Sequence, residues 1–417
     1  MKRRFRVLFN RAAAGSNRAT RVDAEDHSIR TSEAEPVLWH PAPRFHPFGF
    51  WAVVLAVALA PVGIMGPWDA VWDLVGGLML IATVIGPVTR RAVINIGLAA
   101  TVALYAALTL AWSPEVGAGT PVALALGIWV VSYLGVSAAA KNLRLTHHLR
   151  IVAALWTFGI GVGLIMVSQG DYAIKGIEWD WPIRHAAMAG VALSALSLST
   201  RKGRRLSGIG AITLLVGILL TEARTALAVL LLIMIAIGVS WVTPRIRTLG
   251  TAVLVVGLGL AILAPAVQTR FTGGDTISAI SSNRSDVWSA TAAACDQWII
   301  GEGTGFANTI ARTTHDGFPD PHNEFLRFGC DIGVGLLPIV GFVMFAIMRS
   351  FTLLGARSNS RIGIAALSAI GTLVIFAGFW NPLTALEYMV PLMAVIALAD
   401  RSLEIMQEHG YLETQLP

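Results

Sequence analysis

Long apolar runs separated by short polar segments dominate this chain, and each run approaches the length at which an α-helix crosses a bilayer. About 20 apolar residues span roughly 30 Å of hydrocarbon. Twelve runs fit this description: 49–66, 71–89, 94–112, 120–138, 151–168, 184–199, 206–221, 225–242, 249–266, 331–348, 362–379 and 385–400. The pattern predicts an all-α fold, a polytopic membrane helix bundle of about twelve transmembrane helices with a large outer loop before the tenth.

Basic residues between the runs test this prediction, because cytoplasmic loops of membrane proteins are enriched in Lys and Arg. With the N-terminus inside, 24 of the 31 Lys and Arg residues fall in the predicted cytoplasmic segments. We therefore expect both termini in the cytoplasm. The expected organisation is a cytoplasmic tail (1–48), nine helices (49–266), an outer loop (267–330), three helices (331–400) and a cytoplasmic tail (401–417).

Composition narrows the class of protein further. Charged residues make up 13% of the chain, against roughly 25% in soluble domains, and the mean hydropathy is +0.67. The net charge of +6 is scattered between spans, so no nucleic-acid partner is expected. The absence of a GxxxxGK[ST] motif argues against ATP hydrolysis. Two cysteines exclude a four-cysteine zinc site, and we expect neither metal nor cofactor.

Residues 282–335 form the main polar stretch, with three arginines, two of the nine histidines and both cysteines. We expect Asn283 or Ser285 to cap a helix that begins near Arg284. Helical spacing would place one set of side chains on a single face of this helix: Trp288, Ala292, Cys295 and Ile299. The glycine-rich segment 301–305 is interpreted as a flexible connector.

A second helix start is expected at Asp320, which would be its N-cap, with Pro321 at the first helical position. His322 would then lie in the first turn, where the positive helix end favours a neutral imidazole that can accept a proton. A structural role for His322 in the cap is equally open, and His315 is a weaker candidate base. The acidic and histidine residues nearby match no metal-ligand spacing.

Arg224 lies in a tight outer turn, between Glu222 and Thr225. A cation there opposes the helix dipole, so an anionic partner is expected, either a substrate or simply Glu222 or a lipid phosphate. Arginines bind diphosphates bidentately, and a nearby base can deprotonate an alcohol. Together these groups suit transfer from a lipid diphosphate to a hydroxyl.

Several short motifs also resemble the signature of the O-antigen ligase/polymerase superfamily, over roughly residues 215–345. They are Glu222-Ala223-Arg224-Thr225-Ala226-Leu227, Arg284-x3-Trp288, Gly303-Thr304-Gly305-Phe306, Pro321-His322-Asn323-Glu324-Phe325-Leu326 with Gly329, and Gly333-Val334-Gly335-Leu336. The resemblance implies inverting, metal-independent glycosyl transfer from an undecaprenyl-diphosphate-linked glycan at the periplasmic face of a bacterial inner membrane.

The resemblance also implies roles for particular residues. Arg224 would hold the diphosphate and His322 would activate the acceptor hydroxyl. Arg284, Asn323 and Glu324 would bind substrate, whereas Arg312 and Arg327 match no motif. The implied partners are the lipid-linked donor, a glycan or lipid A-core acceptor, membrane lipids and proteins of polysaccharide assembly and export.

Three functions stay open at this point. A polymerase of exopolysaccharide or O-antigen repeat units is favoured over an O-antigen ligase, and a transporter of lipid-linked sugars is the third. If the loop faces an oxidising compartment, Cys295 and Cys330 can form a disulfide. That bond requires their Cα atoms to lie within about 7 Å.

Overall fold

A computed structural model describes ten segments of the chain: residues 47–65, 69–140, 143–168, 180–198, 204–221, 226–234 without 228 and 232, 284–314, 321–355, 360–379 and 381–408. These segments are helical, with no β-strand among them, which confirms the predicted all-α class. The predicted span 249–266 and most of 225–242 lie outside the described residues. The total of twelve spans therefore stays a prediction, as does the extent of the outer loop.

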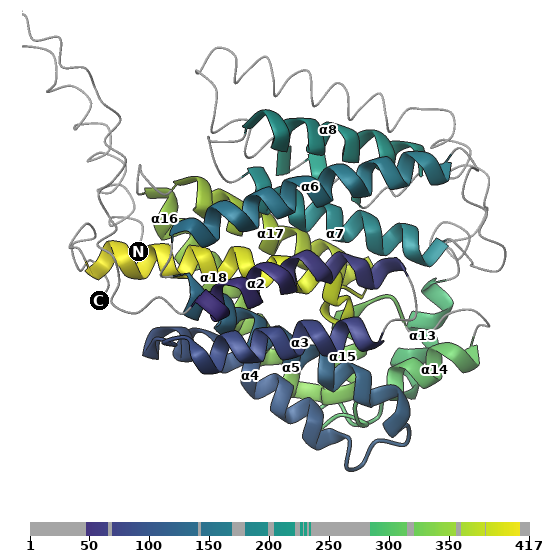
Figure 1. Cartoon of the computed structure of the whole chain (residues 1–417). Helices are drawn as coiled ribbons and strands as arrows, with labels where there is room; N and C mark the ends of the chain where they lie inside the picture. The colour runs from purple at the N-terminus through teal and green to yellow at the C-terminus, as the bar shows by residue number, and fades with distance from the viewer. Residues whose placement is uncertain are drawn as a thin grey trace, which may run out of the picture. The chain divides into compact units, whose positions relative to one another are not determined.

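The helices of the first half follow the predicted apolar runs closely (Figure 1). They are α2 (Pro47–Leu59), η1 (Ala60–Met65), α3 (Asp69–Ile85), α4 (Arg90–Thr109), α5 (Val116–Ala139), α6 (Leu143–Ser168), α7 (Asp180–Leu198) and α8 (Arg204–Leu220). Thr89 caps α4 by accepting a hydrogen bond from the Ala92 N–H. Hydropathy thus located the ends of these helices to within about four residues, except that α6 begins eight residues before the predicted run 151–168.

The second half contains three short α-helices followed by three long ones, with two 3-10 turns among them. They are α13 (Arg284–Ala294), α14 (Phe306–Thr314), α15 (Glu324–Ile332), η2 (Gly333–Leu336), α16 (Leu337–Gly355), α17 (Ser360–Phe379), η3 (Pro382–Thr384) and α18 (Leu386–Glu408). The predicted run 331–348 proves to be part of a longer stretch, because α15 precedes it and η2 interrupts it. Gly333, with φ +55°, ends α15 at this interruption.

By length and composition, four helices among the described residues can cross a membrane: Arg90–Thr109, Val116–Ala139, Leu145–Ser168 and Glu324–Leu353. Five shorter apolar helices accompany them. Large apolar side chains such as Leu104, Leu124 and Met348 are exposed on the outside of these helices. An apolar exterior of this kind suits a lipid environment, so the chain is a membrane protein.

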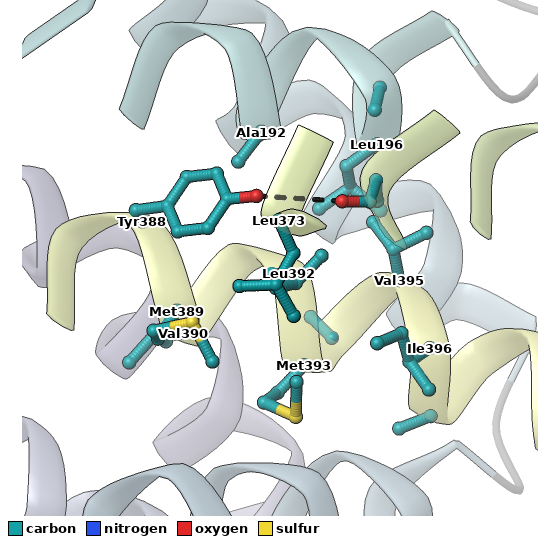
Figure 2. Close-up of a cluster of buried hydrophobic side chains, with 14 of the residues drawn as sticks. Ala192, Leu196, Leu373, Tyr388, Met389, Val390, Leu392, Met393, Val395 and Ile396 are labelled. Atoms are coloured by element: carbon teal, nitrogen blue, oxygen red, sulfur yellow. Dashed lines mark hydrogen bonds between the residues drawn. The ribbon is translucent and has the colours of Figure 1, made fainter. Parts of the chain in front are cut away.

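Helix α18 forms the centre of the bundle and packs against α5, α7, α16 and α17 (Figure 1). Its residues are almost all buried, including Tyr388, Leu392 and Met393. Figure 2 shows this core, where the Tyr388 hydroxyl donates a hydrogen bond to the Ala369 carbonyl of α17 at 3.4 Å. Small residues such as Ala192 on α7 allow the neighbouring helix to approach closely.

Polar contacts gather at the two ends of α4. Beside its first turn, the Thr89 hydroxyl lies 3.5 Å from the Glu404 carboxylate near the end of α18. Beside its last turn, Thr109 and Thr304 are hydrogen-bonded at 2.6 Å. Twenty helical residues separate these contacts, or roughly 30 Å along the axis. The C-terminal part of α18 and the segment 299–305 therefore lie at opposite ends of the bundle.

Candidate functional site

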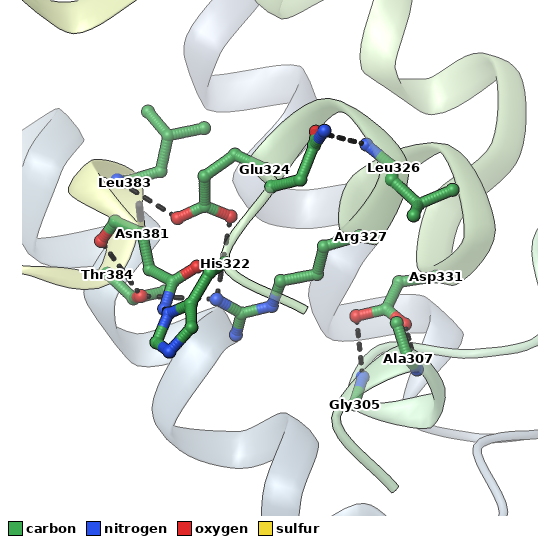
Figure 3. Close-up of polar contacts among 11 residues, drawn as sticks. Gly305, Ala307, His322, Glu324, Leu326, Arg327, Asp331, Asn381, Leu383 and Thr384 are labelled. Atoms are coloured by element: carbon green, nitrogen blue, oxygen red, sulfur yellow. Dashed lines mark hydrogen bonds and ion pairs between the residues drawn. The ribbon is translucent and has the colours of Figure 1, made fainter. Parts of the chain in front are cut away.

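His322 meets the turn between α17 and α18 (Figure 3). Its Nδ1 atom lies 3.2 Å from the side-chain nitrogen of Asn381, 59 residues further along the chain. His322 has a φ of +51°, the one positive φ of a non-glycine residue in the described segments. L-residues seldom adopt this conformation, so the surrounding contacts hold the backbone there. The Nδ1 side of the ring is engaged, and proton exchange with a substrate would use Nε2.

The predicted N-terminus of the helix after His322, with Asp320 as its cap, was wrong. Asn323, not Asp320, is the N-cap of α15, and its side-chain oxygen accepts a hydrogen bond from the Leu326 N–H at 3.0 Å. The helix begins at Glu324, so His322 precedes it instead of occupying its first turn. Asn323 has the extended backbone and the side-chain acceptor that an N-cap requires. Asn323 thus has a structural contact, and its role in substrate binding stays a prediction.

The Glu324 side chain links α15 to the turn before α18. Its side chain is 1% exposed, and one carboxylate oxygen accepts a hydrogen bond from the Leu383 N–H at 3.1 Å. The other oxygen lies 3.5 Å from the Arg327 guanidinium, which also donates to the Thr384 hydroxyl at 3.2 Å. Figure 3 shows these groups gathered around His322. We call His322, Glu324, Arg327, Asn381 and Thr384 the His322 cluster.

Sequence reasoning missed three members of this cluster: Arg327, Asn381 and Thr384. Arg327 was noted but given no role, although it is only 2% exposed. A usable signal existed for the other two, because Asn381-Pro382 interrupts the apolar sequence between the last two predicted spans. That signal marks a turn but cannot identify its partner, which lies far away in sequence.

Two buried polar atoms of the His322 cluster have no hydrogen-bond partner within the described segments. They are the side-chain oxygen of Asn381 and Nε of Arg327. Buried polar groups in folded proteins are almost always paired. One acceptor and one donor in the same cluster are therefore left to pair with a polar group of a ligand or, after a small rearrangement, with each other.

The glycine-rich segment 301–305 is a packed turn, contrary to the flexible connector that was expected. Gly301, Gly303 and Gly305 have φ values of +81°, +108° and +100°. A Cβ on Gly303 would lie 2.5 Å from the Ser113 Cα, so only glycine fits there. The Asp331 carboxylate accepts hydrogen bonds from the N–H groups of Gly305 and Ala307, both at 2.9 Å (Figure 3). The turn thereby fastens α14 to α15.

Helix α13 begins at Arg284, as expected. Ser285 lies inside this helix, so it is not the cap, and the alternative Asn283 lies outside the described residues. The helix ends at Ala294, which leaves Cys295 and Ile299 beyond it, and Ile299 is exposed. The predicted single face was therefore wrong, because the helix stops one turn earlier than its spacing indicated.

Cys295 and Cys330 form the disulfide that the sequence left open, with Cα atoms 5.5 Å apart. Trp288 adds a second link, because its indole nitrogen donates to the Pro321 carbonyl at 2.7 Å. The first link joins α13 to the end of α15, and the second joins it to the residue before His322. The helix that carries Arg284 is therefore held beside the His322 cluster.

Arg224 lies outside the described residues, so its separation from His322 is not defined and its role stays a prediction. Among the described residues, no group of three or more His, Cys, Asp and Glu side chains could hold a metal ion. The chemistry available in the His322 cluster is proton exchange at an imidazole that an amide orients, next to a buried guanidinium paired with a carboxylate.

Comparison with protein families gives a match to part of the chain. Residues 209–346 match a protein-family model described as O-antigen ligase. This region includes Arg224, Arg284 and His322, and it ends within α16. A search of curated proteins finds no match.

Proposed function

We propose, from the match of residues 209–346 to the O-antigen ligase model, that this membrane protein of the O-antigen ligase/polymerase superfamily is a glycosyltransferase of lipid-linked glycans. The donor would be an undecaprenyl-diphosphate-linked glycan, and the acceptor a sugar hydroxyl at the periplasmic face. The reaction would join repeat units of exopolysaccharide or O-antigen. The observation that carries this proposal is the His322–Asn381 contact at the start of α15, inside the matched region.

The proposed chemistry is one displacement. Nε2 of His322 takes the proton of the acceptor hydroxyl, and the hydroxyl oxygen attacks the anomeric carbon of the donor. The bond between that carbon and the diphosphate oxygen breaks, and undecaprenyl diphosphate leaves with the bonding electrons. Attack opposite to the leaving group inverts the anomeric configuration.

The leaving diphosphate needs positive charge, which arginines supply through paired N–H donors without a metal ion. We assign this role to Arg224, with Arg284 as a second contact with diphosphate or glycan. Glu324 would support the site by holding the 381–384 turn, because its carboxylate is occupied by Arg327 and the Leu383 N–H. Asn323 would act near the glycan while capping α15.

The Cys295–Cys330 disulfide supports a periplasmic location for the site, because disulfides persist in oxidising compartments. The charge distribution of the loops agrees, with 24 of 31 basic residues in the segments predicted to be cytoplasmic. The proposed setting is therefore a bacterial inner membrane with both termini in the cytoplasm and residues 267–330 in the periplasm.

Ligation of finished O-antigen to lipid A-core is a second candidate, because the matching model is described as O-antigen ligase. Transport of lipid-linked sugars has less support. A transporter would line a path through the membrane with polar groups. Here the ion pair Arg349–Asp400 lies towards the end of α18 opposite to the His322 cluster, and apolar residues such as Leu392 fill the helix between them.

Deletion of the gene, followed by gel analysis of surface and lipid-linked glycans, tests the proposal. Lipopolysaccharide with a single repeat would identify an O-antigen polymerase, and loss of a secreted polymer would identify an exopolysaccharide polymerase. Finished polymer left on its lipid carrier would identify a ligase. Unchanged glycans in all three fractions would contradict the proposed function.

A further inference from the structure

We infer that Asn381 is a positioning residue that selects the tautomer of His322, with its amide oxygen accepting the Nδ1–H of the imidazole when His322 acts as base. This inference rests on the proposed function, in which His322 takes the proton of the acceptor. The pairing depends on tertiary structure, because 59 residues separate the two side chains.

The position of Asn381 is fixed from two sides. Its backbone carbonyl accepts a hydrogen bond from the Thr384 hydroxyl at 3.4 Å, and Pro382 follows it as the first residue of η3. From the opposite element, Glu324 accepts the Leu383 N–H at 3.1 Å. Asn381 is 8% exposed. A buried amide held in this way presents one end to Nδ1 of His322 at 3.2 Å.

The end of the amide that faces the imidazole decides what His322 can do. If the amide nitrogen donates to Nδ1, a neutral ring carries its proton on Nε2 and cannot accept another there. If the amide oxygen faces Nδ1, that atom carries the proton, and Nε2 is the ring nitrogen without a proton that can act as a base. Rotation of the amide by 180° exchanges the positions of its oxygen and nitrogen and so converts one state into the other, without moving the neighbouring residues.

The reaction itself favours the oxygen towards His322. Proton abstraction produces an imidazolium, which has a proton on both ring nitrogens and needs an acceptor at Nδ1. Of the two ends of the Asn381 amide, which lies 3.2 Å from Nδ1, only the oxygen can accept that hydrogen bond.

Several described titratable groups on the elements around the cluster have other contacts or lie at the surface. Glu324 pairs with Arg327, His185 on α7 pairs with Glu387 on α18, and Asp331 accepts N–H groups at the start of α14. Tyr105 on α4 donates to the Ile300 carbonyl, and Asp286 on α13 and Arg312 on α14 are exposed. The neutral amide of Asn381 contacts the Nδ1 atom directly.

Solid-state NMR of the full-length protein in lipid bilayers tests the tautomer directly. The protein would carry 15N-labelled histidine, and the signal of His322 among the nine histidines would be identified by its loss in His322→Gln. In the neutral ring we expect the proton on Nδ1 in the wild type and in Asn381→Asp. In Asn381→Leu we expect it on Nε2. A wild-type ring with its proton on Nε2 would overturn the inference.

Glycan transfer in the deletion strain gives an independent readout. A carboxylate can accept the Nδ1–H but cannot donate, so Asn381→Asp should keep transfer within about threefold, whereas Asn381→Leu should lose about 100-fold, the scale of general-base catalysis. In Asn381→Asp the carboxylate favours the imidazolium, so transfer should fail at a higher pH on acidification than in the wild type. Asn308→Leu removes another buried amide, on α14, and should retain transfer.

The two proposals fail in different ways. Normal transfer by His322→Ala would refute the proposed function. Loss of transfer in His322→Ala together with equal losses in Asn381→Asp and Asn381→Leu, at normal membrane levels, would leave the proposed function standing and refute the role of the amide as acceptor.

Discussion

Two buried polar clusters in this protein differ in the backbone that carries them. The His322 cluster comes from a helix cap, a residue with positive φ and the turn before α18. The second, which we call the Asp400 cluster, consists of Tyr133, Arg349 and Asp400 inside α5, α16 and α18. There Arg349 lies 2.9 Å from the Asp400 carboxylate, which also accepts the Tyr133 hydroxyl.

The difference separates a structural role from a chemical one. Side chains within packed helices are held in one arrangement, which suits a tie between helices. Functional groups are found disproportionately where a rigid scaffold positions irregular backbone, as in the His322 cluster. The matched O-antigen ligase region includes His322 and Arg327 but ends at residue 346, before Arg349 and Asp400. We therefore assign chemistry to the His322 cluster and stability to the Asp400 cluster.

The largest expected effect is that of His322→Ala, because it removes the proposed base. Glycan transfer should fall by about 10²- to 10⁴-fold while the amount of protein in the membrane stays unchanged. Gel analysis of surface glycan in the complemented deletion strain measures this effect. Polymer at the wild-type level would show that His322 is not the base. It would also contradict the assignment of chemistry to the His322 cluster.

Arg224→Ala should have the next largest effect on transfer. Loss of charge-assisted hydrogen bonds to the diphosphate costs about 1.5–3 kcal/mol, or roughly 10- to 100-fold in rate. Arg224→Lys keeps the charge but loses the paired donors, so it should recover only part of the activity. The same glycan gel measures both variants, and equal activity of Ala and wild type would show that Arg224 serves only the membrane interface.

Glu324→Gln and Asp400→Asn form a matched pair, one in each cluster. Each removes one partner of a buried ion pair, which costs about 3–5 kcal/mol of folding stability. Both should lower the thermal unfolding temperature of the purified protein in detergent. At equal amounts of folded protein, transfer should fall about tenfold or more in Glu324→Gln only. Equal losses in both variants would contradict the division of roles.

The disulfide should contribute a smaller effect. Replacing Cys295 and Cys330 by serine removes a link worth about 2–4 kcal/mol between α13 and α15. We expect a lower unfolding temperature and a modest loss of transfer, since Trp288 still joins α13 to Pro321. Alkylation with and without reductant, followed by mass spectrometry, tests the bond itself. Free thiols in protein isolated from the native membrane would contradict the periplasmic placement.

Gly303→Ala is the smallest expected change. It places a Cβ against Ser113 at a φ of +108° and should cost about 1–3 kcal/mol of stability. Transfer at equal amounts of folded protein should change little, because the turn contacts the C-terminal end of α15, near Asp331, and not the end beside His322. Calorimetry and the glycan gel separate these two effects. A variant as stable as the wild type would show that the turn tolerates a side chain.

Local sequence allowed part of the candidate site to be predicted. Arg284 begins a helix as its context indicated, and the two cysteines are paired. His322 was singled out because the positive end of the expected helix favours a neutral imidazole that can accept a proton. The start itself was displaced by three residues, because Asn323 supplies a cap that competes with Asp320 and Pro321. Caps depend on one side-chain hydrogen bond, which hydropathy does not register.

The sequence alone determined that this is an all-α membrane protein, where most described helices lie, and which polar stretch differs from the rest. Those properties follow from the free energy of transferring each segment to lipid, which depends on the segment itself. Only the tertiary structure decided that Asn381 meets His322, that Glu324 braces a distant turn, and that the glycine-rich segment packs against Ser113. Such contacts join residues far apart in the chain, and their geometry is set by how the helices pack.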